Sequence, residues 1–343
     1  NERIQINGKD IPDETFAKVT ENVKEKTEKI VGAGFPHPTV FELITAISFL
    51  YFKEENVDFV VLEVGLGGRL DSTNVIDGSL LSVITTVDYD HMNVLGDSLD
   101  KIAREKAGII KENGTVLSYP QKDEVFKTLK EVSKDKNADF SVCPIENINV
   151  KELNEYGAVF DFKYKNDIFE DMKINLLGLH QVYNASLAIS AIAILRNKGL
   201  IKTSNEEIKR GLTNTFWKGR LEVLRRKPIF LIDGAHNLQG IKTLVKSLEL
   251  FKYNRLILGM SIFKDKDFSH MVENIAPLAD EIIITEINNP RKMDAENLAK
   301  EVGKANKNMI IEKDIKKAIE KSLNIANKDD LIVFAGSIYL IGD

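Results

Sequence analysis

The chain has 343 residues, 43% of them hydrophobic and 29% charged, with a formal net charge of −5. This composition is typical of a globular protein and lacks the overall positive charge of a nucleic-acid-binding chain. The single cysteine, Cys143, excludes a disulfide framework within the chain and a multi-cysteine zinc site, and it fits the reducing cytoplasm. No apolar run approaches the roughly 20 residues that span a bilayer, so we expect neither membrane nor nucleic acid as a partner.

The first part of the chain alternates between helical and strand patterns. Apolar residues recur at helical spacing in the second predicted helix, and Ser204 with Glu207 forms a capping box that starts the last one. The predicted helices cover residues 15–30, 38–53, 98–110, 123–135, 180–197 and 204–213. The predicted strands cover residues 58–64, 81–87, 114–119, 139–143, 158–164 and 172–177.

The pattern becomes regular after residue 220. The apolar runs IFLID, RLILGM, EIIIT, NMIIE and LIVFAG alternate with amphipathic stretches of helix length. Such alternation indicates an α/β fold in which a mostly parallel sheet carries helices on both faces. We place the domain boundary near residues 215–220. The first domain is then residues 1–215, the linker 216–220, and the smaller Rossmann-like domain 221–343.

Polar clusters follow three of the predicted strands. Glu63 stands before GLGGR, His91 ends the segment DYDH, and Asp233 begins DGAHN. In open α/β sheets, ligands bind beyond the carboxyl ends of the strands. The convergence of the three clusters on such ends therefore predicts a binding site.

Glu63 and His91 suit a divalent cation, because oxygen ligands with an occasional nitrogen and several waters favour Mg²⁺ or Mn²⁺. The alternative is that Glu63 pairs with Arg69 or Arg104 and that His91 is an ordinary loop histidine. The glycines after Glu63 let the backbone approach another group closely. GLGG is also a weak dinucleotide-binding signal, but it lacks the full G-x-G-x-x-G pattern.

Lys106 and Arg220 each have two interpretations. Lys106 stands near the apolar end of a predicted helix, where it is either a surface lysine or a desolvated, reactive amine. Arg220 stands at the predicted domain boundary, where it either clamps a phosphate or forms a structural ion pair. The turn after Asp233 leads into a helix whose N-terminus suits anions.

Taken together, these segments resemble the folylpolyglutamate synthase/dihydrofolate synthase family of the Mur ligase superfamily. The most specific pieces are LEVGLGGRLDSTN and IAREKAGIIK. The other matching pieces stand in family order along the chain: NERIQING, PTVFELITAISF, DHMNVLGDSLDK, GLHQVYNASLA, FWKGRLEV, IDGAHN and GSIYLIG. The resemblance implies a Mur-ligase-like ATP-binding domain followed by a smaller Rossmann-like glutamate-ligase domain.

The resemblance also implies a role for each matching residue. Glu63 and His91 match Mg²⁺ ligands, and Lys106 matches a lysine that carries a carbamate supporting a second metal. The remaining roles are Asn184 for adenine, Arg220 for phosphate, Asp233 for ribose, His236 beside the phosphate and glutamate region, and Ser337, with Asp233, near the substrate. Lys106, His236 and Arg220 are the predicted catalytic residues.

The implied reaction is ATP-dependent amide formation. ATP activates the γ-carboxylate of a folate, or the carboxylate of dihydropteroate, as an acyl phosphate, and L-glutamate then attacks it. Mg²⁺ is the expected metal and K⁺ a further candidate cation. We expect a cytoplasmic monomer with small-molecule substrates.

The chain departs from the family in one respect. The family has a phosphate loop, G-x-x-x-x-G-K-[ST], near its N-terminus, and the 343 residues contain no such pattern. We expect roughly 40–50 family residues to be missing before Asn1, judged from the size of a strand–loop–helix unit, and weak catalysis by this chain alone. The alternatives are a nucleotide- or pterin-binding fragment without catalysis and a cell-wall Mur ligase, which the two most specific pieces disfavour.

Overall fold

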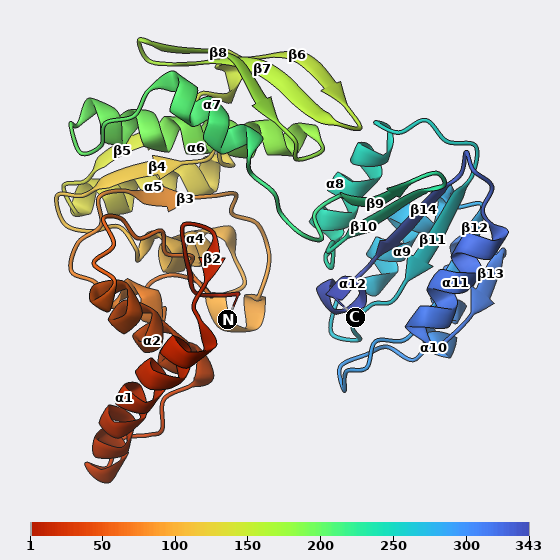
Figure 1. The fold of residues 1–343 in the computed structure, drawn as a ribbon, viewed down its shortest axis with the longest axis horizontal. Helices are drawn as coiled ribbons and strands as arrows, with labels where there is room; N and C mark the ends of the chain where they lie inside the picture. The colour runs from red at the N-terminus through yellow and green to blue at the C-terminus, as the bar shows by residue number, and fades with distance from the viewer. Residues whose placement is uncertain (1, 343) are drawn as a thin grey trace. The chain divides into compact units, whose positions relative to one another are not determined.

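The computed structural model describes residues 2–342 (Figure 1). These residues fall into two compact units, divided between Cys143 and Pro144. The predicted ligase domains, residues 1–215 and 221–343, are a different division and remain a prediction. Among the described residues, no helix is both long and apolar enough to cross a membrane.

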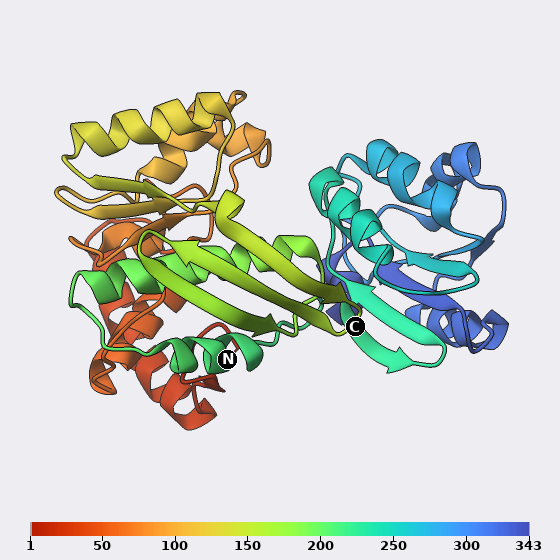
Figure 2. The same cartoon turned by 90° about the horizontal axis from the view of Figure 1, so that it is seen from above.

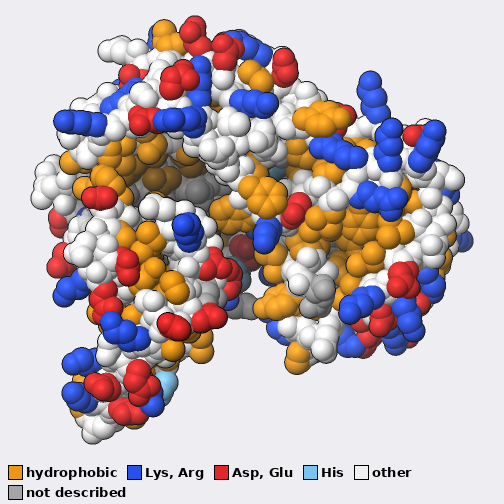
Figure 3. Space-filling model, viewed as in Figure 1, with side chains coloured by type: hydrophobic (Ala, Val, Ile, Leu, Met, Phe, Trp, Pro, Cys, Tyr) orange, Lys and Arg blue, Asp and Glu red, His pale blue; other side chains and the backbone are white. Residues whose placement is uncertain are grey.

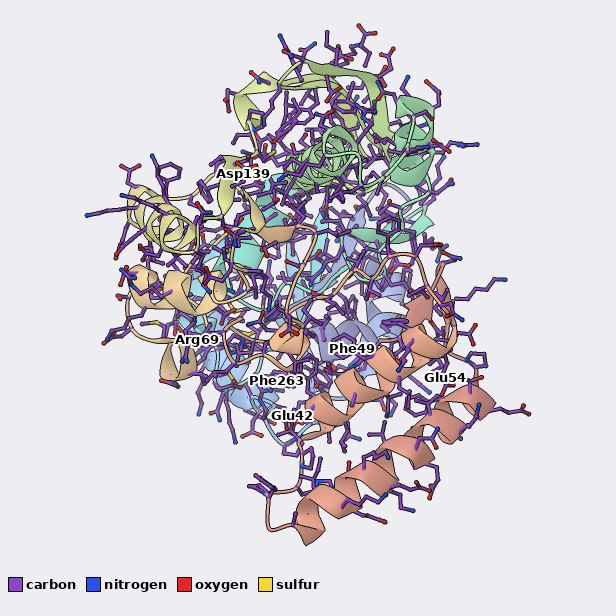
Figure 4. All side chains as sticks on the ribbon, turned by 90° about the vertical axis from the view of Figure 1, so that its left-hand side faces the viewer. Glu42, Phe49, Glu54, Arg69, Asp139 and Phe263 are labelled. Atoms are coloured by element: carbon purple, nitrogen blue, oxygen red, sulfur yellow. The ribbon has the colours of Figure 1, made fainter. Side chains whose placement is uncertain are left out.

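The first unit begins with a short hairpin and two helices. β1 (Gln5–Ile6) pairs with β2 (Lys9–Asp10), and α1 (Asp13–Gly32) and α2 (Val40–Glu54) follow. A capping box starts α2, because the Thr39 side chain accepts the N–H of Glu42 and the Glu42 carboxylate accepts the N–H of Thr39. Figure 4 labels Glu42 and Glu54 at the two ends of α2, and Figure 3 shows that α1 presents mostly charged side chains.

A parallel sheet forms the rest of the first unit. Its order is β3 (Ser82–Ile84), β4 (Thr115–Ser118) and β5 (Asp139–Val142), with η1 (Ser72–Val75) and α3 (Met92–Leu95) in the connections. α4 (Leu99–Ala107) and α5 (Asp123–Asp135) pack together, and their apolar faces share one core with the sheet. That core contains Ile84, Ile102, Ala103, Val116, Val125 and Leu129.

The predicted strand at residues 58–64 is wrong. No strand among residues 2–342 pairs with this segment, and the side chains of Phe59, Val60 and Val61 are exposed, with Val61 97% accessible. A strand needs a neighbouring backbone to satisfy its N–H and C=O groups, and an apolar run alone does not supply one. Figure 3 shows hydrophobic side chains reaching the surface among charged ones on the face that it displays.

The second unit opens with an antiparallel sheet covered by helices (Figure 2). After η2 (Ile145–Asn147), the strands β6 (Ile148–Asn154), β7 (Gly157–Tyr164) and β8 (Asp167–Ile174) form a meander. α6 (Leu179–Asn197) packs on β7 and β8, and α7 (Asn205–Thr213) packs on β8.

The predictions for this region were partly correct. The helices at 180–197 and 204–213 and the strand at 158–164 are confirmed, including the capping box of Ser204 and Glu207. The second strand lies earlier than predicted, as β8, and the prediction missed β6. β6 is an edge strand whose side chains are mostly exposed, so its sequence lacks the apolar alternation that marks a half-buried strand.

The regular α/β pattern after residue 220 is confirmed as a mostly parallel sheet in the order β13-β12-β11-β14-β10-β9. Only β9, at one edge, runs antiparallel among these described strands. The strands are β9 (Glu222–Arg226), β10 (Ile229–Asp233), β11 (Leu256–Met260), β12 (Glu281–Ile284), β13 (Met309–Ile311) and β14 (Leu331–Ala335).

Helices cover both faces of this sheet (Figure 1). One core contains apolar residues of α8, α9 and α10, and the other contains residues of α11 and α12. β14 is buried along its whole length, as expected for a parallel strand with helices on both sides. The bounds are α8 (Leu238–Leu248), α9 (Phe268–Ile275), η3 (Ala276–Leu278), α10 (Ala295–Ala305), α11 (Ile315–Ile325) and α12 (Ile338–Gly342).

The strand register determines which residues share the carboxyl edge of the sheet. Ala335 at the end of β14 lies opposite Asp233 on one side and Met260 on the other. The residues that follow these three strand ends, Gly234, Gly336 and Ser261, therefore leave the sheet at the same edge.

Candidate functional site

Asp233 is the buried carboxylate at this edge, with 8% of its surface accessible. Its two oxygens accept the N–H groups of Leu221 at 2.9 Å and Ala235 at 2.8 Å. Burial raises the pKa of Asp233, although these two hydrogen bonds and the charges of Arg220 and His236 act in the opposite direction. The carboxylate thereby holds two backbone segments in place, one at Leu221 and one at Ala235.

Arg220 lies over the turn that follows Asp233. A Cβ atom at Gly234 would come within 3.3 Å of Arg220 Nη1, so the glycine leaves room for the guanidinium. Within residues 144–342, no carboxylate lies within ion-pair distance of Arg220, although its charge acts on Asp233. The alternative of a structural ion pair between the domains is not decided by this structure, because the two units are not placed relative to one another. An arginine with unused donors is a suitable anion ligand.

His236 and Ser337 lie at the same edge. The backbone joins their segments, because Gly336 N–H donates to Ala235 O at 3.0 Å. His236 Nδ1 lies 2.9 Å from Gly234 O. Because a carbonyl oxygen only accepts, this contact needs a proton on Nδ1, and in the neutral tautomer of this kind Nε2 is an acceptor. Ser337 is buried, and its hydroxyl oxygen accepts the N–H of Tyr339 at 3.2 Å.

The sequence analysis missed Ser261 and His180. The hydroxyl of Ser261 is buried and has no hydrogen-bond partner among the described residues, and its carbonyl oxygen lies against Gly336. A buried unsatisfied hydroxyl costs on the order of 1–3 kcal/mol unless a ligand or water satisfies it. A serine that follows an apolar strand is a weak sequence signal, which explains the omission.

His180, in the first turn of α6, faces Arg220. Burial lowers the pKa of His180, and the nearby charge of Arg220 lowers it further. The preceding Gly178 has φ +95°, and a Cβ atom there would lie 2.7 Å from the His180 ring, so this turn requires glycine. Asn184 stands four residues later and therefore on the same helix face. Its amide donates to Gln181 Oε1 at 3.0 Å.

In the first unit, Lys106 lies in the last turn of α4 and is partly buried. Burial lowers the pKa of the Lys106 amine, and the charge of Asp90 opposes this shift. His91 follows Asp90 with φ +49°, and its Nε2 lies 3.8 Å from Asp90 Oδ1. Lys106 therefore lies near the loop that carries His91, and its role as a reactive amine or a surface lysine remains a prediction.

Glu63 is exposed and makes no hydrogen bond or ion pair with any described residue. The alternative pairing of Glu63 with Arg69 or Arg104 is wrong, because Arg69 pairs with Glu105 and Arg104 pairs with residues of α4 and α5. Within residues 2–342, no group of three or more His, Cys, Asp or Glu side chains is arranged to hold a metal ion.

The glycines of GLGGR make close contacts within the protein. The Asp71 carboxylate accepts the N–H groups of Gly65 at 2.9 Å and Leu66 at 3.0 Å. A Cβ atom at Gly68 would lie 2.9 Å from the carbonyl oxygens of Glu105 and Lys106. The groups that these glycines let the backbone approach are thus protein groups, and the glycines place the loop against the end of α4.

The comparisons with known proteins decide the family. A model of the Mur ligase middle domain matches residues 14–192, and a model of the Mur ligase glutamate ligase domain matches residues 219–338. A dihydrofolate synthase/folylpolyglutamate synthase of Bacillus subtilis is 35% identical over 350 residues, which covers 100% of this chain and 80% of that protein. The chain belongs to the folylpolyglutamate synthase/dihydrofolate synthase family of Mur ligases.

Solved structures of this synthase family confirm the predicted fold class. A folylpolyglutamate synthase of Thermotoga maritima is 33% identical with a TM-score of 0.85, and the match covers 99% of this chain and 77% of that one. A Mycobacterium tuberculosis folylpolyglutamate synthase in complex with ADP is 28% identical with a TM-score of 0.89, and the match covers 99% and 80%.

The predicted residues of this Mur ligase fall into two sets. The set in the second unit comes together around one sheet edge: Arg220, Asp233, His236 and Ser337. His180, which was not predicted, lies near Arg220, whereas the predicted Asn184 shares the helix of His180 and contacts Gln181. In the first unit, Lys106 and the loop of His91 come together through Asp90, whereas no contact joins Glu63 to either of them. The roles of all these residues remain predictions.

Both sets are chemically suited to the groups that the family implies. A free arginine, two histidines and buried hydroxyls at a sheet edge suit a phosphate and an amino-acid carboxylate. A free carboxylate and an imidazole suit Mg²⁺, which keeps several waters and binds substrate phosphates. A neutral Lys106 amine can take up CO₂ as a carbamate with loss of a proton, which would add a further oxygen ligand.

Proposed function

We propose that this protein is an ATP-dependent ligase that joins L-glutamate to the γ-carboxylate of a folate, and also to dihydropteroate. The family supports the reaction class, since the relatives carry the names dihydrofolate synthase and folylpolyglutamate synthase. The observation that carries the proposal is the unpaired Arg220 guanidinium beside buried Asp233 and His236 at the carboxyl edge of a parallel sheet. This arrangement offers a fixed cation to a phosphate and a buried carboxylate to a ribose.

The second unit binds the nucleotide in this proposal. Arg220 donates to a phosphate oxygen, Asp233 accepts a ribose hydroxyl on its remaining lone pairs, and Asn184 bonds the adenine edge. His180 adds an uncharged donor beside Arg220. ADP in complex with the Mycobacterium tuberculosis folylpolyglutamate synthase supports this assignment by similarity.

The reaction proceeds in two substitutions. A carboxylate oxygen of the folate attacks the γ-phosphorus of ATP, which breaks the bond to ADP and forms an acyl phosphate. The amino group of L-glutamate then attacks the acyl carbon, inorganic phosphate leaves with the bonding electron pair, and the amine loses a proton. In this proposal Arg220 stabilises the charge on the transferring phosphoryl group, and His236 Nε2 accepts the proton.

Glu63, His91 and a carbamate on Lys106 would hold the magnesium ions in this proposal. The ions supply charge neutralisation for the phosphates. Ser337 and Ser261 offer hydroxyls to L-glutamate at the sheet edge. We place the reaction in the cytoplasm, on a monomer, with small molecules as its substrates.

A glutamate-ligation assay tests the proposal. The purified gene product, mixed with ATP, Mg²⁺, tetrahydrofolate and L-glutamate, should form folate with an extended glutamate tail, detected by mass spectrometry. Arg220→Ala should lower kcat on the order of 10²-fold or more, because one such donor contributes about 3–4 kcal/mol to the transition state. Arg225→Ala is the matched control. Arg225 is exposed, and its side chain donates only to Lys227 O among the described residues, so the variant should keep wild-type activity. Product formation without dependence on ATP would contradict the proposal.

A further inference from the structure

The Lys111 ammonium donates hydrogen bonds to backbone carbonyls of the loop that follows Arg69. Its Nζ donates to Asn74 O at 3.1 Å and also to Ile76 O, and the side chain is partly buried. Within residues 2–342, no carboxylate lies within ion-pair distance of this ammonium. Charge-assisted bonds to carbonyls are strong, and an ammonium taken out of water needs them. Lys111 therefore holds the backbone of this loop in a defined place.

Asn74 connects the same loop to the end of α4. Its amide donates to Arg69 O at 3.2 Å and to Gly108 O at 3.0 Å. Arg69 N–H donates to Glu105 O at 2.8 Å, and the Arg69 guanidinium pairs with the Glu105 carboxylate at 3.0 Å. Carbonyls in the last turn of a helix lack partners within the helix. Here the loop supplies donors to them, so the loop and the helix end form one unit.

This connection joins the segments that carry two predicted metal ligands, although no contact between the ligands themselves is present among the described residues. The loop begins directly after Glu63, and the helix end carries Lys106. We propose that Lys111, together with Asn74, is a positioning residue that fixes the Lys106 turn relative to the Glu63 loop so that the two segments can hold a divalent cation. The inference rests on the proposed function and deepens it. Lys111 acts through Asn74 and Ile76 and touches no reacting atom.

A merely structural role would appear as lost stability alone, so the test measures metal affinity directly. Mn²⁺ serves as the probe, and its binding to the gene product in the presence of ADP is followed by electron paramagnetic resonance. Lys111→Ala should weaken Mn²⁺ binding at least about 10-fold, the usual effect of removing a residue that supports a metal ligand. Lys111→Arg should restore most of the affinity, because a guanidinium can donate to both carbonyls.

The matched control is Lys136→Ala, since Lys136 pairs with Glu112 at 3.2 Å in the same unit and its ammonium makes no hydrogen bond to the loop among the described residues. It should bind Mn²⁺ as the wild type does. In the ligation assay, Lys111→Ala should lower kcat while leaving KM for L-glutamate unchanged. In ¹³C-bicarbonate, its carbamate signal should fall relative to the wild type.

Asn74→Ala provides a second variant, because it deletes the bonds to Arg69 and Gly108 without removing the ammonium. Weakened Mn²⁺ binding by a folded Asn74→Ala supports the proposal. Wild-type Mn²⁺ affinity in either folded variant overturns it, and so does unfolding of both variants, which would show a structural role. Failure of the wild type to ligate glutamate would refute the proposed function, whereas normal ligation by Lys111→Ala would refute only the positioning role.

Discussion

At the residue scale, the site in the second unit depends on how one carboxylate is buried. Asp233 accepts two backbone N–H groups, and one of them belongs to Leu221, whose φ is +47°. A leucine in the left-handed region is strained and persists only where its surroundings hold it. Asp233 therefore holds the backbone next to Arg220, besides any contact that it makes with ribose.

The buried state of Asp233 gives a pH-dependent prediction. Because burial raises its pKa in the folded protein, the folded state keeps the proton to higher pH than the unfolded state. The stability from this group is complete below the unfolded pKa, about 3.9, and is lost as pH rises through the folded pKa. The free energy of unfolding of the wild type should thus fall relative to Asp233→Asn as pH rises from about 4 toward neutral.

Asp330→Asn is the control of opposite sign. Burial would raise the pKa of Asp330, but the Arg255 guanidinium and the N–H of Asn327 outweigh burial and hold it below its ordinary value. The stability from this group is present above the unfolded pKa, about 3.9, and is lost as pH falls through the lower folded pKa. The wild type should therefore lose stability relative to Asp330→Asn below about pH 4 and show little change relative to it from pH 4 to neutral. Denaturant titrations of the three proteins at several pH values measure both differences. If the difference in free energy of unfolding between wild type and variant changed with pH in the same direction for both substitutions, the account would be contradicted.

At the element scale, glycines decide how the loop of the first unit meets α4. A Cβ atom at Gly108 would lie 2.3 Å from Arg69 Cα and 2.7 Å from Arg69 N, which are backbone atoms that cannot move alone. Gly108→Ala should destabilise the first unit by about 2 kcal/mol or more. Gly211 lies inside α7, and a Cβ atom added there would meet no other atom within 4 Å, so Gly211→Ala should stabilise the protein by about 0.5–1 kcal/mol. Calorimetry measures the stability of the two variants against the wild type. A Gly108→Ala variant as stable as the wild type would refute the tight contact.

The elements also show what the sequence could predict. The strand ends that carry Asp233 and Ser337 were predictable, because alternating apolar runs and helices imply parallel strands whose carboxyl ends share an edge. That residues 58–64 do not form a strand was not predictable, because an apolar run does not show whether another backbone segment pairs with it. The groups that approach Gly65 and Gly68 could not be predicted. A glycine pattern indicates that another group comes close to the backbone, but it does not identify that group. His180 was missed because a single histidine in an apolar helix is most often structural.

At the scale of the whole molecule, the two units carry different parts of the proposed chemistry. The second unit presents an unpaired arginine and a buried carboxylate at a sheet edge, and the first presents a free carboxylate and a partly buried amine. The family match extends over both units, since its two models cover residues 14–192 and 219–338. The central claim is that the chain serves one reaction, in which ATP activates a carboxylate for attack by an amine.

Oxygen transfer tests this claim most directly. Folate labelled with ¹⁸O in its γ-carboxylate is incubated with the purified gene product, ATP, Mg²⁺ and L-glutamate, and the released phosphate is examined by mass spectrometry. Formation of an acyl phosphate moves one carboxylate oxygen onto phosphorus, so the account predicts one ¹⁸O atom in each phosphate released with ligated product. Ligated product accompanied by unlabelled phosphate would contradict it.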